Sequence, residues 1–315
     1  MSATLPTSPA ERHSAPAVPA RALVLLAILT LVWGTNWPLF PLAVREVSVW
    51  SFRAVAVLVA GFALLAYARA RGQSLAIPRR HWRAVLLASL SYLVIWNIAS
   101  TYAAVLIPSG QAAVLGFTMP LWAALFAWAF LGQRLSPRLL CAVGLGALAV
   151  ALLMWRSFQA YAQAPLGMAL GLLSGIGWAV GTLILKRRAI EVPAAVLTGW
   201  QLLIAAVPIG AIALLRGDGQ WFWPSWTSIL VIAYIALVPM SIGNACWFAI
   251  VGLLPANVAG LSSIMVPVVA MIAGALVHGE PLGPLQWLAM GCSAAALWLA
   301  LVKPAVHPSP HPEPG

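Results

Sequence analysis

Polar and aromatic side chains lie near the middle of several long apolar stretches, where lipid would not solvate them. One helical face of residues 84–105 carries, at spacings of three, four and four, Ser89, Tyr92, Trp96 and Ser100. Asn97 lies beside this face. Such groups either line a cavity and hold a small molecule, or pack against a neighbouring helix. The central position of Tyr92 and Trp96 in the stretch favours the cavity.

Further apolar stretches carry groups of the same kind at a comparable depth. Together with Tyr92, Trp96 and Asn97, the predicted substrate-binding residues are Trp33, Asn36, Trp37, Trp178, Ser241 and Asn244. The amides of Asn97 and Asn244 are suited to hold a carboxylate and an amine through uncharged hydrogen bonds. A bond to a neighbouring helix, worth about 1 kcal/mol, explains them nearly as well. Indole rings at this depth would pack against an apolar or aromatic side chain of the ligand.

Charged groups are almost absent from the apolar stretches. Arg53 is the one cation inside a stretch, and it either attracts a carboxylate or reaches the membrane interface; the second interpretation, or a structural pairing, is favoured. No Asp or Glu lies near a centre, so a carboxylate proton relay is not expected, and His278 is the sole titrating candidate. No Walker loop, dinucleotide-binding glycine set, HExxH or nucleophile elbow is present. We therefore expect no catalytic residue, metal site or cofactor.

The composition places these stretches in a membrane. Of the 315 residues, 63% are hydrophobic and 7% are charged, and the mean hydropathy is +0.96. A soluble domain is about a quarter charged, so a soluble enzyme, a disordered protein and a disulfide scaffold are excluded. The net charge of +11 is spread over short gaps between apolar runs. This pattern indicates membrane orientation and argues against nucleic acid as a partner.

At about 20 residues per span, the apolar runs predict ten transmembrane helices. The predicted spans are residues 23–44, 50–69, 84–105, 111–131, 138–155, 166–186, 193–215, 227–250, 257–277 and 284–302. Helices are favoured over barrel strands because the runs are continuous and do not alternate. Residues 1–22 are predicted to be a disordered cytoplasmic lead, residues 156–165 a linker, and residues 304–315 a disordered tail.

The distribution of Arg and Lys predicts the orientation. With the N-terminus in the cytoplasm, the inner loops and termini hold thirteen basic residues and the outer loops hold three. Basic residues accumulate on the cytoplasmic side of membrane proteins. Both termini are therefore expected in the cytoplasm.

A shift of 147 residues aligns the second half of the chain with the first. The matched pairs are Pro108 with Pro255, Pro120 with Pro267, Gly132 with Gly279 and Asn97 with Asn244. At a shift of 148, Phe52-Arg53 falls on Trp200-Gln201. Matched Pro, Gly and Asn in one register are hard to obtain by chance. Each repeat, 23–155 and 166–303, holds five spans, so the two must enter the membrane in opposite orientations, as in many secondary transporters.

The motif W-G-T-N-W-P at residues 33–38 resembles the W-G-x-N start of EamA-type members of the drug/metabolite transporter superfamily. Its degenerate copy is W-A-V-G at residues 178–181. Phe52-Arg53 fits as well, and so do the segments from Pro120 to Ser136 and from Pro267 to Leu282, although Gln133 stands where the family usually has Glu. The resemblance covers about residues 22–303. The Trp-rich central spans make the chain most similar to the aromatic amino acid exporters of that superfamily.

The resemblance and the repeat together imply a multi-pass exporter of the bacterial inner membrane. Its expected substrates are aromatic or other apolar amino acids and related metabolites, moved by alternating access without obligatory proton coupling. The candidate hinges are Pro38, Pro120, Pro239 and Pro267. The first alternative is a drug, nucleoside or polyamine carrier, although a carrier of cations is expected to place a carboxylate in its cavity. A polytopic membrane enzyme is a distant alternative, and a monomer and a homodimer both stay open.

Overall fold

The computed structural model describes residues 20–132, 137–156, 164–188, 190–216, 224–246 and 266–301. Within these ranges every regular element is helical. Several expectations lie outside them: most of the lead, the tail and the linker, the segment around Gln133, and the first part of the ninth span.

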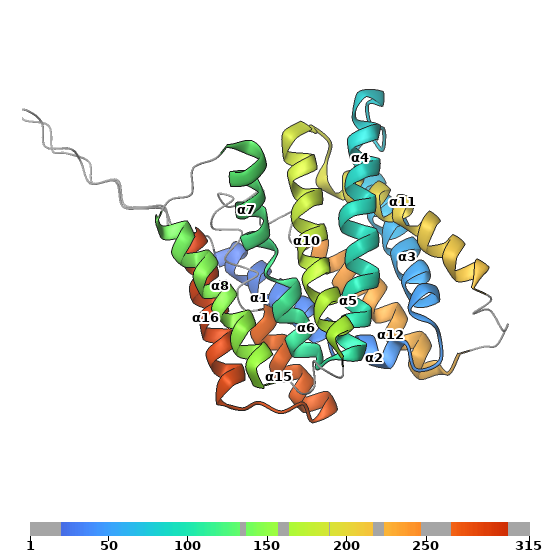
Figure 1. Cartoon of the computed structure of the whole chain (residues 1–315). Coiled ribbons are helices and arrows are strands. Elements are labelled where there is room, and N and C mark those ends of the chain that lie inside the picture. Colours follow the sequence, from blue (N-terminus) through green and yellow to red (C-terminus); the bar gives the residue numbers. More distant parts are fainter. Residues whose placement is uncertain are drawn as a thin grey trace, which may run out of the picture.

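The helices form a bundle in which segments from both halves of the chain lie side by side (Figure 1). The first half contains α1 Ala20–Asn36, α2 Leu39–Ala43, α3 Val49–Ala70, η1 Arg79–His81, α4 Trp82–Ala88, η2 Ser89–Val94, α5 Ile95–Leu106, α6 Ser109–Gly116, α7 Met119–Leu131 and α8 Pro137–Arg156. The second half contains α10 Pro165–Arg188, α11 Ala194–Leu215, α12 Trp226–Leu237, η3 Val238–Gly243, α15 Val266–His278 and α16 Pro284–Leu301.

Five candidate membrane spans occur among the described residues. They are Val49–Ala70, Arg79–Leu106, Pro165–Leu185, Ala194–Leu215 and Trp226–Cys246. Shorter apolar helices accompany them, and many large apolar side chains are exposed on the bundle surface. Such an extensive apolar surface is unfavourable in water and favourable in lipid. The protein is therefore a polytopic helical membrane protein, as the composition predicts. The count of ten spans and the orientation of the termini stay predictions.

Two spans that the sequence predicts as continuous helices are broken. The first span stops at Asn36 and restarts as α2 after Pro38, and the fourth stops at Gly116 and restarts as α7 at Met119. Proline has no N–H to donate and disfavours helical backbone in the residue before it, so a new helix begins at or next to each proline. The predicted spans 23–44 and 111–131 therefore each contain two helices, and the candidate hinges Pro38 and Pro120 lie at the breaks.

Two π-helical segments interrupt the third and eighth spans. They are η2, between α4 and α5, and η3, which follows α12 and contains Pro239. A shift of 147 residues places η2 over 236–241, so the two segments overlap in the register of the sequence repeat. A π segment adds a residue to a helical turn and is common at functional sites.

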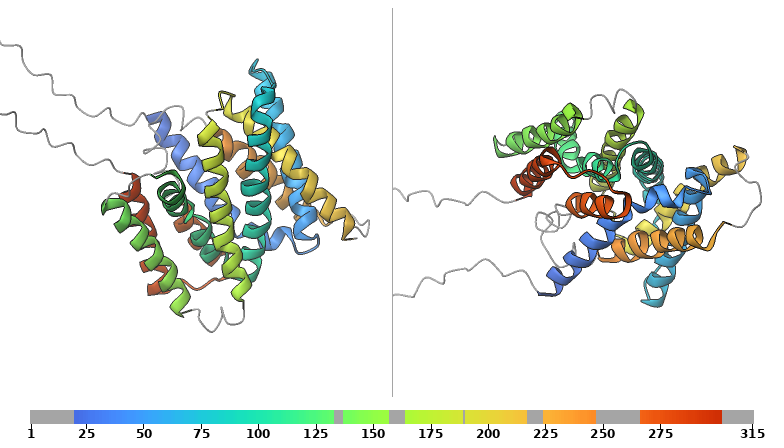
Figure 2. Two further views of the ribbon diagram at one scale, coloured as in Figure 1. Left: turned by 45° about the horizontal axis from the view of Figure 1, so that its top comes forward. Right: turned by 90° about the horizontal axis from the view of Figure 1, so that it is seen from below.

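Helix packing joins the two halves (Figure 2). The pair α3 and α11 and the pair α8 and α16 make the most extensive contacts, and α10 packs on α5, α6 and α7. Gly167, Gly171 and Gly175 form a ridge of small residues along the sixth span, and they lie in these contacts. A Cβ atom on Gly175 would lie 3.0 Å from the carbonyl oxygen of Gly116, so only glycine allows this approach of α10 to α6.

Candidate functional site

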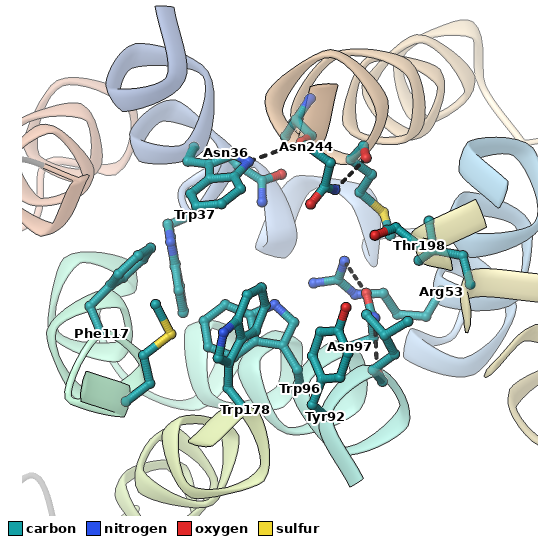
Figure 3. Close-up of a pocket in the computed structure, with 16 residues that line it drawn as sticks. Asn36, Trp37, Arg53, Tyr92, Trp96, Asn97, Phe117, Trp178, Thr198 and Asn244 are labelled. Carbon is teal, nitrogen blue, oxygen red and sulfur yellow. Dashed lines mark hydrogen bonds between the residues drawn. The ribbon is translucent and has the colours of Figure 1, made fainter. Parts of the chain in front are cut away.

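A pocket lies among helices from both halves of the chain (Figure 3). The structure brings eight of the nine predicted substrate-binding residues to its wall: Trp33, Asn36, Trp37, Tyr92, Trp96, Asn97, Trp178 and Asn244. Residues that the sequence patterns did not single out complete it: Leu93, Phe117, Met119, Thr198, Leu202 and Met240. The space open to the centres of water molecules is about 70 Å³, or roughly five to seven waters. A compact metabolite matches that size.

Aromatic rings form one wall of the pocket. Trp96 lies at the centre, with its ring 4.7 Å from that of Trp178 and 5.8 Å from that of Trp37. Tyr92 meets Trp178 at 5.0 Å, and Phe117 meets Trp96 at 6.1 Å. The interplanar angles of these pairs are between 68° and 87°, so the rings meet edge to face, the favourable arrangement for aromatic quadrupoles.

The broken helix and the π segments place these rings. Trp37 lies at the break between α1 and α2 and is 2% exposed, so its indole fills the interior at the point where the helix stops. Tyr92 belongs to η2, and Trp96 follows on α5 one turn later. On the opposite side, Trp33 Nε1 donates to the carbonyl oxygen of Pro239 at 3.0 Å, which ties α1 to η3. The side chains of the first span are thus held against the eighth.

Arg53 is buried, with only 1% of its surface exposed. Its Nε donates to Thr101 Oγ1 at 2.5 Å and its Nη1 donates to Asn97 Oδ1 at 3.0 Å. The guanidinium also lies 4.2 Å from the ring centre of Phe40 and 4.8 Å from that of Phe52. Of the two favoured interpretations, access to the membrane interface is wrong, because α3 directs Arg53 inward; the structural pairing fits, since α5 supplies acceptors for the guanidinium.

The two repeat-related asparagines make the same bond to their own helices. Asn97 Nδ2 donates to the carbonyl oxygen of Leu93 at 2.7 Å, and Asn244 Nδ2 donates to that of Met240 at 2.5 Å. Asn97 also accepts from Arg53, so both polar ends of its side chain are engaged within the protein. Asn97 thus holds Arg53 in place, and direct binding of a ligand by its amide stays a prediction.

Three other polar residues that the sequence placed near the site are turned toward their own helices or buried in packing. The hydroxyl of Ser241 donates to the carbonyl oxygen of Ala236 at 2.9 Å, and Ser241 is absent from the pocket wall. The hydroxyl of Ser89 donates to the carbonyl oxygen of Val85 at 2.7 Å. Ser100 is fully buried and absent from the pocket wall, and its hydroxyl has no hydrogen-bond partner among the described residues. Small hydroxyl side chains in helices readily bond to a carbonyl one turn back, which spacing alone does not reveal.

The four prolines that the sequence names as hinges lie at irregular points of the helices. Pro38 and Pro120 lie at the two helix breaks, Pro239 lies inside η3, and Pro267 lies in the first turn of α15. Their role in movement stays a prediction.

Polar contacts join the helix ends on the side of the bundle that the charge pattern places outside the cell. Glu280 Oε1 accepts from the backbone N–H and the hydroxyl of Ser109, both at 2.8 Å, and so caps α6. His278 Nε2 lies 2.6 Å from the carbonyl oxygen of Pro38. Glu46 accepts from the N–H of Ser225 at 2.7 Å, and hydrogen bonds from Ser225 lower the pKa of this carboxyl. These contacts connect the two halves of the chain on this side.

The pocket wall offers no metal site. Its lining contains no Asp, Glu, His or Cys, and no cluster of three such side chains occurs in the described part of the chain. Aromatic rings, amides and one guanidinium are suited to reversible binding of a small molecule.

A helical membrane bundle with a ligand-sized pocket between its halves is the architecture of a membrane transport protein. The chain belongs to the EamA-like transporter family, whose model matches residues 20–155 and again 165–302.

Curated relatives carry transporter names. "Uncharacterized transporter YvbV" of Bacillus subtilis is 26% identical, over 83% of this chain and 85% of the relative. "Uncharacterized inner membrane transporter YedA" of Escherichia coli is 28% identical, over 90% of this chain and 92% of the relative. An E. coli protein named "Probable amino-acid metabolite efflux pump" is 27% identical, over 50% of this chain and 55% of the relative.

A solved crystal structure shares the fold. It has a TM-score of 0.65 at 20% sequence identity, and the similarity covers 89% of this chain and 96% of that chain. At this level of identity the likeness concerns the arrangement of the helices alone.

Proposed function

We propose that the protein exports aromatic or other apolar amino acids and related small metabolites across the inner membrane by alternating access. The observation that carries the proposal is the pocket itself, where an aromatic wall faces amides and a buried cation. An aromatic wall favours a ligand with a flat or apolar body, and the polar groups require a polar head. Amino acids with apolar side chains combine both features in one compact molecule.

Alternating access is supported by the distribution of the pocket wall over the two halves. Trp37 and Trp96 come from the first half, and Trp178 and Asn244 come from the second. Movement of one half against the other would therefore open and close the pocket around its ligand. The helix breaks and the two π segments border the pocket and give the backbone places to bend.

Cationic drugs and polyamines fit the pocket less well. As far as the structure describes it, the lining contains Arg53 and neither Asp nor Glu, so a cationic ligand would meet a like charge and no counter-ion there. The proposal therefore favours amino acids over cations within the family.

The decisive measurement is counterflow in proteoliposomes that contain the purified protein. Vesicles loaded with an unlabelled amino acid, drug or nucleoside are diluted into labelled L-tryptophan, L-phenylalanine or L-leucine, with protein-free liposomes as the control. We expect labelled amino acid to accumulate transiently when the vesicles are loaded with an amino acid. Accumulation driven only by a nucleoside or a cationic drug would contradict the proposed substrate class.

The same vesicles test the energy source. No carboxylate occurs among the described residues that line the pocket, so we expect exchange to proceed without an imposed pH gradient. Exchange that requires the gradient would contradict the absence of obligatory proton coupling.

A further inference from the structure

Arg53 is a buried cation for which the described part of the protein supplies no counter-ion. Its interactions are two hydrogen bonds to neutral side chains and contacts with two phenylalanine rings. Burying an unpaired charge in a membrane bundle is expensive, and such groups normally pair or face a water-filled path. Arg53 belongs to the pocket wall, next to the space that a ligand would occupy.

The acidic residues of the chain are placed elsewhere. Of the six Asp and Glu residues, Glu46 and Glu280 bind helix ends and Glu191 is exposed before α11. The other three are, by sequence, in the lead, in the 217–223 segment and in the tail. No acid occurs in the 247–265 segment either. The described residues thus supply no anion for Arg53, and a ligand in the pocket is placed to supply one.

The guanidinium is held in a fixed position with one nitrogen left over. Thr101 and Asn97 take Nε and Nη1, and the rings of Phe40 and Phe52 lie beside its plane. Nη2 is buried and has no hydrogen-bond partner among the described residues. Figure 3 shows the guanidinium directed toward the open centre of the pocket. A planar, charged donor held in this way is suited to a carboxylate.

A free acceptor complements this donor. The amide oxygen of Asn36 is buried and has no hydrogen-bond partner among the described residues. Asn36 belongs to α1 and faces the pocket across from Arg53, with the aromatic wall to one side of both (Figure 3). A buried amide oxygen without a donor is unfavourable, and an ammonium group would satisfy it.

We propose that Arg53 binds the carboxylate of the substrate and that Asn36 Oδ1 accepts a hydrogen bond from its ammonium group. The aromatic wall of Trp37, Trp96 and Trp178 then holds the side chain. This assignment rests on the proposed function and makes it more specific: the substrate is a zwitterionic amino acid, recognised at both charges. Asn97 and Thr101 are positioning residues, because they act by orienting the guanidinium.

Ligand analogues test the assignment in the unaltered protein. L-tryptophan, L-tryptophanamide, tryptamine and indole-3-propionate compete for counterflow of labelled L-tryptophan, and their binding is measured in parallel by thermal stabilisation in detergent. Removing the carboxylate, as in the amide and the amine, should weaken binding roughly 10- to 100-fold, the effect of a hydrogen bond to a charged group. Indole-3-propionate keeps the carboxylate and should lose less. Binding of tryptamine as tight as that of tryptophan would overturn the role of Arg53.

Variants locate the effect. In Arg53→Gln the ratio of the affinities for tryptophan and tryptamine, here called the preference, should fall to about one. Thr101→Val should weaken binding but keep the preference, since the cation remains. Arg45→Gln removes the same charge at an exposed position and should change neither property. A structural role for Arg53 would lower stability but leave this preference unchanged, and that result would refute the assignment. If Arg53→Gln does not fold, Arg53→Lys and the analogue series in the unaltered protein decide the question.

The outcomes separate the two proposals. If amino acids exchange but their carboxyl-free analogues bind equally well, the proposed function stands and the Arg53 assignment fails. If indole-3-propionate stabilises the protein and is exchanged while no amino acid is, the Arg53 assignment stands and the proposed function fails.

Discussion

At the scale of single residues, the contact between Trp96 and Trp178 joins the two halves of the chain inside the pocket. Both rings are only half-buried, unlike Trp37, which is 2% exposed. Their remaining surface faces the pocket, where a ligand can cover it. Loss of either ring therefore enlarges the pocket and removes a surface that a ligand would contact.

We predict that Trp96→Ala and Trp178→Ala impair transport more than folding. Removing an aromatic partner of the ligand should lower the apparent affinity roughly 10- to 100-fold. Trp128→Ala is the matched control, because this indole is 51% exposed on the bundle surface. Counterflow rate is measured against the amount of monodisperse protein recovered from the membrane. Loss of protein together with loss of flux would show that the rings are structural.

Glu46 gives a second prediction at this scale. Hydrogen bonds from Ser225 favour its ionised form in the folded protein, so its pKa lies below the ordinary value of 4.5. This contribution to stability is present above pH 4.5 and is lost as the pH falls through the lower folded pKa. Glu46→Ala should therefore lower Tm slightly at pH 7. The difference from the unaltered protein should shrink below pH 4.5, and a difference that grows with acidity would contradict this origin.

At the scale of elements, close packing of α10 depends on glycine at defined positions. A Cβ atom on Gly177 would lie 2.6 Å from the carbonyl oxygen of Ser91 in η2, and a backbone atom cannot move aside cheaply. The same helix meets the Tyr92 side chain at Gly181. The fit of α10 against η2 thus positions one aromatic pair of the pocket.

We predict that Gly177→Ala destabilises the protein by about 1–3 kcal/mol through overpacking. Gly144→Ala and Gly291→Ala are matched controls, since an added Cβ on either helical glycine would meet nothing within 4 Å. These two should be neutral or stabilising by up to about 1 kcal/mol, because alanine favours helix more than glycine does. Thermal unfolding in detergent makes the comparison. Equal effects of all three changes would argue against a tight contact at Gly177.

At the scale of the whole molecule, the packing pairs support the inverted repeat. A shift of 147 residues exchanges α3 with α11 and α8 with α16, and these are the pairs in closest contact. The same shift relates the contact of α1 with α15 to that of α10 with α7. Such exchange is expected when a two-fold axis relates the halves. The repeats differ where Arg53 is replaced by Gln201, so the symmetry is broken at the proposed carboxylate position.

The orientation in the membrane can be tested by cysteine labelling. Single cysteines are introduced into a variant that lacks the three native cysteines. Ser74→Cys labels the loop that contains Arg71, Arg79 and Arg80, and Arg45→Cys labels the loop before α3. Both positions are exposed. The positive-inside rule predicts that a membrane-impermeant maleimide added to intact spheroplasts labels position 45 and leaves position 74 unlabelled. The reverse pattern would invert the predicted topology and make the protein's direction of transport an open question.

Much of the architecture follows from local pattern. Runs of about 20 apolar residues must be helical in lipid, because each backbone group then finds a partner within its own segment. Each predicted span is accordingly helical over most of its described residues, with breaks at 37–38 in the first span and 117–118 in the fourth. Trp96 and Trp178 lie in mid-span, away from the membrane interface where tryptophan is usually found. This position predicted a cavity beside them.

Tertiary structure decided what the side chains do. Arg53 lies near a helix end, where a long cation can usually reach water, and only the arrival of Thr101 and Asn97 from α5 holds it inward. Asn97, which was predicted to contact the ligand, is a hydrogen-bond partner of that arginine for the same reason. The sequence by itself determined the membrane environment, the helical spans and the internal sequence repeat, since these depend on composition and spacing along one chain. The charge at the centre of the pocket was decided by contacts between residues 44 and 48 positions apart, which no local pattern encodes.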